Sequence, residues 1–113
     1  MAIALLAGCG GGNSNAQPAG SIKVSMTEFK FTPGDLSAPA GNVVFFLVND
    51  GNGISHDMVI QDSSGKTVAK SELVSSGDSV VFPVNNIAAG AYTVICDQPG
   101  HKDSGMKGTL TIT

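Results

Sequence analysis

The stretch VVFFLV, from Val43 to Val48, is the part of the sequence that decides the fold class. It is far shorter than the about 20 apolar residues that a membrane-spanning helix needs, so it does not predict a transmembrane segment. A short run of β-branched and aromatic residues that follows a turn signal, here Pro39-Ala40-Gly41, is typical of a buried strand. We expect this strand to be the most buried one of a β-structure.

The rest of the chain from Ser21 onward also has the period of strands. In SIKVSMTEF, Ile22, Val24 and Met26 fall on one face, and polar residues fall on the other. In HDMVI, His56 shares a face with two apolar residues. Further strands are expected at SVVFPV, GAYTVIC and GTLTIT, which are residues 79–84, 90–96 and 108–113.

Turn signals separate these strands. Pro33-Gly34 breaks the chain before Val43, and SSGK at Ser63–Lys66 is typical of a hairpin turn. Pro83 favours an edge position or a bulge for its strand. Between Lys66 and Ser75 the pattern is weak, and we expect a short helix or an irregular loop there. The sequence predicts an all-β protein, a Greek-key β-sandwich of seven to eight strands.

The chain has 113 residues, which suffice for one domain with a sandwich-sized core. Only 13% of the residues are charged, and the net charge is −3. Nucleic-acid binding needs clustered positive charge, so we expect no nucleic-acid partner.

The N-terminus contains LAGC, from Leu6 to Cys9, which resembles a bacterial lipobox. We interpret residues 1–8 as the remnant of a signal peptide, without the usual positive charge, and residues 9–20 as a flexible tether lipidated at Cys9. The alternative is a chance LAGC in a tail. The folded domain would be residues 21–113, anchored to the outer face of the cytoplasmic membrane or in the periplasm. A disulfide between Cys9 and Cys96 is not expected, because the tether would constrain little that folds.

The loop CDQPGHKDSGMKG, from Cys96 to Gly108, combines a cysteine, a histidine and a methionine. Cys96 shares the inward face of its strand with Val94, and His56 opens another strand. Each such residue alone has a structural explanation: a buried cysteine, a hydrogen-bonded core histidine, or a methionine that fills a gap. Together with His101 and Met106 they form a candidate set of metal ligands.

The residue types narrow the choice of metal. A trigonal plane of two histidines and one cysteine, with a weak axial methionine, is the blue-copper arrangement. A catalytic zinc site with His56, Cys96, His101 and water remains an alternative, although it leaves Met106 unexplained. Calcium and magnesium prefer oxygen ligands, and a dinuclear copper site needs two cysteines in the loop.

Residues 21–113 resemble the cupredoxins, the small blue-copper proteins, and CDQPGHKDSGM is most similar to the auracyanin and plastocyanin branch. GAYTVIC resembles the G-x-Y-x-x-x-C run of this family, and MKGTLTI resembles its closing strand. The resemblance implies one type 1 copper ion, bound by His56, Cys96 and His101 and weakly by Met106. Two residues beside the ligands depart from the family pattern, since Asp57 replaces a frequent asparagine and Asp97 a frequent serine or threonine. If these carboxylates lay close together, they would repel unless protonated, solvated or hydrogen-bonded.

The resemblance implies an electron carrier and not an enzyme. It would carry single electrons between membrane redox complexes or soluble partners, and we expect a monomer. A periplasmic protein for copper delivery or storage is the alternative, and an interaction domain without metal is a third. The electron would leave through His101, framed by Phe29, Ile54, Pro99 and Gly100. Lys102 and Asp103 would lie at the rim of this surface and steer redox partners.

Overall fold

The computed structural model of the protein describes residues 16–113. The predictions for residues 1–8 and for Cys9 therefore lie outside the described residues. Within the described part no helix is long and apolar enough to cross a membrane.

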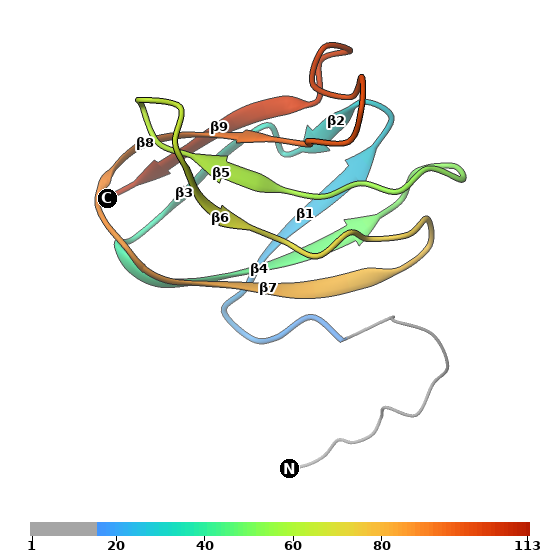
Figure 1. Ribbon diagram of the computed structural model, residues 1–113. Coiled ribbons are helices and arrows are strands. Elements are labelled where there is room, and N and C mark those ends of the chain that lie inside the picture. The colour runs from blue at the N-terminus through green and yellow to red at the C-terminus, as the bar shows by residue number, and fades with distance from the viewer. Residues whose placement is uncertain (1–15) are drawn as a thin grey trace.

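In residues 16–113, nine strands form two sheets that pack face to face (Figure 1). The strands are β1 (Ile22–Thr27), β2 (Lys30–Thr32), β3 (Asp35–Ala38), β4 (Gly41–Asn49), β5 (Val59–Gln61), β6 (Thr67–Lys70), β7 (Ser79–Ile87), β8 (Gly90–Ile95) and β9 (Lys107–Ile112). One sheet has the order β2-β1-β4-β7, and the other has the order β3-β9-β8-β5-β6. The predicted all-β sandwich is confirmed.

The chain crosses between the sheets several times, so both sheets are mixed. β1 pairs in parallel with β4, and β3 pairs in parallel with β9, whereas the other pairs are antiparallel. The core lies between the sheets. Its fully buried apolar side chains include Val24, Met26, Phe45, Leu47, Met58, Ile60, Val94 and Leu110. Burial of these side chains is the main force that holds the two sheets together.

The strand β4 contains the apolar run that opened the sequence analysis. Val43, Phe45 and Leu47 face the core, and Asn49 continues the same alternation at the end of the strand. β4 lies between β1 and β7, so its backbone is paired on both sides. Pro83 lies in β7, which is an edge strand as predicted, because a residue without an N–H group is tolerated there.

The expectation for Lys66–Ser75 was wrong in part, because Thr67–Lys70 form the strand β6 instead of a helix or a loop. β6 is an edge strand that pairs only with β5 and is mostly exposed. Ala69 alone among its four residues is partly buried against the core, so β6 lacks the apolar alternation by which strands are recognised. Together with the three-residue strand β2, it brings the number of strands to nine.

Gly108 in β9 has a packing role. A Cβ atom on Gly108 would collide with the carbonyl oxygen of Gly34 and lie 3.3 Å from a methyl group of Val94. The Gly34 carbonyl accepts a hydrogen bond from the N–H of Thr109, at 2.9 Å, so this approach is part of the β3–β9 junction. Only glycine fits at this position without moving the backbone.

Candidate metal centre

The ligand candidates meet at the end of the sandwich where β4 and β8 end and β9 begins. Cys96 follows β8 directly, and Met106 precedes β9. His56 lies in the connection between β4 and β5, and it forms an isolated bridge with Val74. His56, Cys96 and Met106 are fully buried, and 8% of His101 is exposed.

Three ligand-type atoms face one another at this end of the protein. The Nδ1 atoms of His56 and His101 lie 3.2 Å apart, and the Sγ atom of Cys96 lies 3.4 Å from Nδ1 of His101 and 4.0 Å from Nδ1 of His56. The circle through these atoms has a radius of about 2.1 Å, which is close to the length of a metal–nitrogen bond. The triangle is therefore the right size for one metal ion bonded to all three atoms. Among the described residues, His56, Cys96 and His101 are the group of histidine, cysteine and carboxylate side chains that could hold a metal.

The protonation chemistry of the triangle also fits a cation. Burial raises the pKa of the Cys96 thiol, so a thiolate without a bound cation is unfavourable there. Burial lowers the pKa of His56, and the neighbouring His101 lowers it further, so the imidazole is held neutral. Nε2 of His56 is buried and has no hydrogen-bond partner in the described part of the chain. A cation between the three atoms would use the Nδ1 lone pairs and favour the thiolate.

The backbone of the β8–β9 loop supports this arrangement. The N–H of Cys96 donates to the carbonyl of Met106 at 3.2 Å, and the N–H of Met106 donates to the carbonyl of His101 at 3.0 Å. These bonds keep Cys96, His101 and Met106 together although the loop has no regular secondary structure. Cys96 forms no disulfide with any residue in the described part of the chain.

Asp57 links the two ligand-bearing segments. Its Oδ1 accepts a hydrogen bond from the backbone N–H of Asp97 at 2.9 Å, and its Oδ2 lies 3.4 Å from Nε2 of Gln98. Burial raises the pKa of the Asp57 carboxyl, and the side chain of Asp97 adds to this effect. The side chain of Asp57 lowers the pKa of the Asp97 carboxyl, as does Lys70, whose Nζ lies 2.8 Å from Oδ2 of Asp97. The two carboxylates do lie close together, and hydrogen bonds and a lysine offset their repulsion.

Two supporting residues, Asn49 and Lys70, did not emerge from the sequence analysis. Asn49 carried a signal, because it is in phase with the inward-facing residues of β4 and is only 1% exposed. Lys70 carried none. It reaches Asp97 because β6 and β8 both pair with β5, and the sequence does not show this order.

Phe29 is the aromatic neighbour of the centre. Its ring contacts the ring of His101 edge-on, with centroids 4.9 Å apart and an angle of 62° between the rings. The other residues named for the exit surface, Ile54, Pro99 and Gly100, are exposed.

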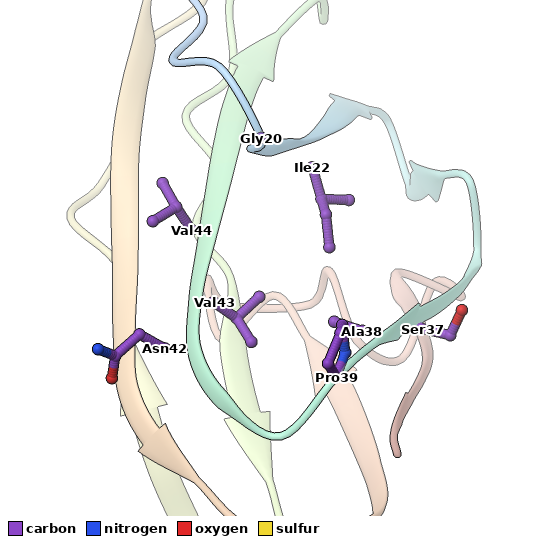
Figure 2. A pocket seen from close by; sticks show the side chains of 8 residues that line it. All are labelled: Gly20, Ile22, Ser37, Ala38, Pro39, Asn42, Val43 and Val44. Carbon is purple, nitrogen blue, oxygen red and sulfur yellow. The ribbon is translucent and has the colours of Figure 1, made fainter.

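Two hollows in the described part of the chain have no ligand side chains in their lining. One of about 300 Å³ is lined by Gly20, Ile22, Ser37, Ala38, Pro39, Asn42, Val43 and Val44. Figure 2 shows Ile22 and Val43 turned toward this space, which has no ionisable side chain in its lining. It lies where β1 and β4 begin, whereas the ligands lie beyond the end of β4. We assign it no role in the metal centre.

Comparisons with known proteins agree with this reading of the site. The family described as copper-binding proteins of the plastocyanin/azurin family matches residues 18–113. Auracyanin-B of Chloroflexus aurantiacus is 29% identical over 134 residues, and the match covers 92% of this chain. The chain spans 57% of the length of that curated relative.

Solved structures show the same likeness. An auracyanin B structure is 28% identical, with a TM-score of 0.75, and the match covers 92% of this chain and 96% of that one. Oxidised plastocyanin from Dryopteris crassirhizoma is also 28% identical, with a TM-score of 0.58, and the match covers 80% of this chain and 99% of that one.

Proposed function

The chain belongs to the plastocyanin/azurin family of copper-binding proteins, and from this premise we propose that it is a blue-copper electron carrier. One type 1 copper ion would be held by His56, Cys96 and His101, with Met106 as a weak axial ligand. The observation that carries the proposal is the buried triangle of two imidazole nitrogens and one cysteine sulfur. The buried thioether candidate on the same loop favours copper over zinc, which binds methionine poorly.

When bound, copper supplies a one-electron couple. The contribution of the protein is to hold the ligands in nearly the same place in both oxidation states. The ligand residues lie at strand ends and are tied by backbone hydrogen bonds, and the Asp57–Asp97 bond joins the two segments that carry them. A site held this way rearranges little on electron transfer, which keeps the barrier to transfer low.

We place the electron exit at His101. His101 is the less buried of the two histidines, with 8% of the residue exposed against 0% for His56. Phe29 packs against this ring, and Pro99, Gly100 and Ile54 lie exposed in the neighbouring loops. A small apolar surface suits redox partners that must bind briefly and dissociate quickly. Lys102 and Asp103 are exposed beside it, and the protein would act as a monomer.

We also propose that Cys9 carries a lipid that anchors the protein outside the cytoplasm. The LAGC motif supports this, as does the position of residues 16–20, which lead into β1 at the end of the sandwich away from the β8–β9 loop (Figure 1). Such an anchor leaves the His101 surface free to meet partners. Cys9→Ser, expressed with a complete signal peptide, should move the protein from the membrane fraction to the soluble fraction. An unacylated wild-type protein in mass spectrometry would contradict the anchor.

Purified protein with Cu(II) tests the electron-carrier function. It should become intensely blue, because the thiolate transfers charge to copper, and it should bleach reversibly with a reductant. Cys96→Ser should abolish the blue band. A protein for copper delivery would instead bind Cu(I) and stay colourless, and that result would overturn the proposal.

A further inference from the structure

The turn between β1 and β2 contacts the surroundings of both histidines. It carries Phe29, whose ring packs edge-on against His101. The preceding residue, Glu28, reaches in the other direction, toward the segment 50–55 that leads from β4 to His56.

Glu28 binds this segment through its carboxylate. The backbone N–H of Asn52 donates to Oε2 of Glu28 at 2.9 Å and to Oε1 at 3.2 Å. A Cβ atom on Gly51 would lie 2.6 Å from Oε1 of Glu28, so a larger residue at position 51 would push the carboxylate aside. Glycine at this position lets the carboxylate lie against the backbone of the segment.

The charge of Glu28 lies beside the metal centre. The N–H of Asn52 holds the pKa of the Glu28 carboxyl below its ordinary value, so the group is ionised at neutral pH. Glu28 is joined to Phe29, whose ring contacts the ring of His101, and its carboxylate binds Asn52 in the segment that leads to His56. A negative charge beside both histidine-bearing segments favours added positive charge between them.

We propose that Glu28 is a positioning residue of the metal centre with two effects. Its hydrogen bonds to Asn52 hold the segment before His56 against the turn that carries Phe29. Its negative charge favours the more positive, oxidised state of the centre and so lowers its reduction potential. The second effect rests on the proposed function, and the first does not.

Three variants separate the two effects. Glu28→Gln removes the charge but keeps an oxygen that can accept from Asn52. Glu28→Asp keeps the charge but shortens the side chain, so the carboxylate no longer reaches the N–H of Asn52. Asp50→Asn is the control, because it removes one negative charge from the same segment, where the exposed Asp50 accepts a hydrogen bond from Oγ of Ser25 at 2.7 Å.

The first measurement is hydrogen exchange of the Asn52 amide in metal-free protein, followed by NMR. Glu28→Asp should speed this exchange by about fivefold or more, since one charge-assisted hydrogen bond is lost. Glu28→Gln and Asp50→Asn should change it much less. An unchanged rate in Glu28→Asp would overturn the positioning effect.

The second measurement is a redox titration of copper-loaded protein at low and at high salt. At a fixed ambient potential, Glu28→Gln should lower the ratio of oxidised to reduced protein by about twofold or more relative to Asp50→Asn. The difference should shrink at high salt, because Glu28 is accessible to solvent. Equal potentials for the two variants would overturn the charge effect. If the wild type shows no reversible one-electron couple, the proposed function fails together with the charge effect, and the exchange rates still decide the positioning effect.

Discussion

The side chain of Asn49 is hydrogen-bonded to the backbone of Ile54, with Nδ2 donating to the Ile54 carbonyl at 2.8 Å. The same Nδ2 donates to the carbonyl of Val74 at 2.8 Å, and Oδ1 accepts from the N–H of Gly51 at 2.8 Å. Val74 in turn exchanges two backbone hydrogen bonds with His56. A single buried side chain thus fixes both the segment that leads to His56 and the segment around Val74 that pairs with His56.

Asn49→Ala should lower the free energy of unfolding of the metal-free protein by about 2–3 kcal/mol, because the carbonyls of Ile54 and Val74 and the N–H of Gly51 each lose a hydrogen-bond partner. Urea denaturation measures this. Asn85→Ala is the control, since Asn85 is exposed on β7, and it should change stability by about 0.5 kcal/mol or less. Equal effects of the two changes would contradict the role of Asn49.

Met106→Gln should keep a coloured copper site but lower its reduction potential, because a harder axial oxygen ligand favours Cu(II). Redox titration of the visible band measures the shift. Met58→Gln is the matched change at another fully buried methionine. A shift with Met58→Gln and none with Met106→Gln would show that the axial assignment is wrong.

Gly100→Glu should slow electron exchange with a redox partner while leaving the visible spectrum nearly unchanged, since it adds a charge to the surface around His101. Gly100 has φ of 81°, so Gly100→Ala is needed to measure the effect of backbone strain alone. Stopped-flow kinetics should show a slower rate for the glutamate than for the alanine variant. Equal rates would place the electron exit elsewhere.

Lys102→Glu should act mainly on the ionic-strength dependence of the same reaction. Lys102 is exposed at the rim of the surface, where a charge steers the encounter and adds little to the bound state. Stopped-flow kinetics over a range of salt concentrations measure the slope of the electron-exchange rate against ionic strength. Lys66→Glu, in the distant turn between β5 and β6, should leave the slope much closer to that of the wild type, and a similar change for both would argue against steering at Lys102.

Gly108→Ala should destabilise the protein by about 1–3 kcal/mol, because its methyl group would push the Gly34 carbonyl away from β9. Thermal unfolding of the metal-free protein measures the effect. Gly34→Ala is the control in the adjacent segment, since its methyl group would meet only the carbonyl oxygen of Phe31, at an ordinary contact distance of 3.7 Å. Equal stability of Gly108→Ala and wild type would show that the β3–β9 junction can relax.

Local patterns in the sequence were enough to predict the fold class and the contents of the ligand loop. Alternating side chains mark β1 and β8, and the unbroken apolar run of Val43–Val48 marks β4. The short spacing of Cys96, His101 and Met106 brings them together in one loop. His56, which lies 45 residues before His101, joined this set because the alternation places it on the core face at the start of HDMVI, and the resemblance to cupredoxins gave the four residues their roles. Their roles as copper ligands remain predictions, although the structure places His56, Cys96 and His101 around one point.

Only the tertiary structure decided which residues, distant in the sequence, hold the segments around the metal centre in place. Glu28 meets Asn52, Asn49 meets Val74, and Lys70 meets Asp97, over separations of 24, 25 and 27 residues. Each contact depends on strand order and register, and on loops that cross from one sheet to the other. Periodicity reports which face of a strand is buried, because that depends on neighbours along the chain. It does not report which strand lies alongside, because that depends on how all the strands pack into one core.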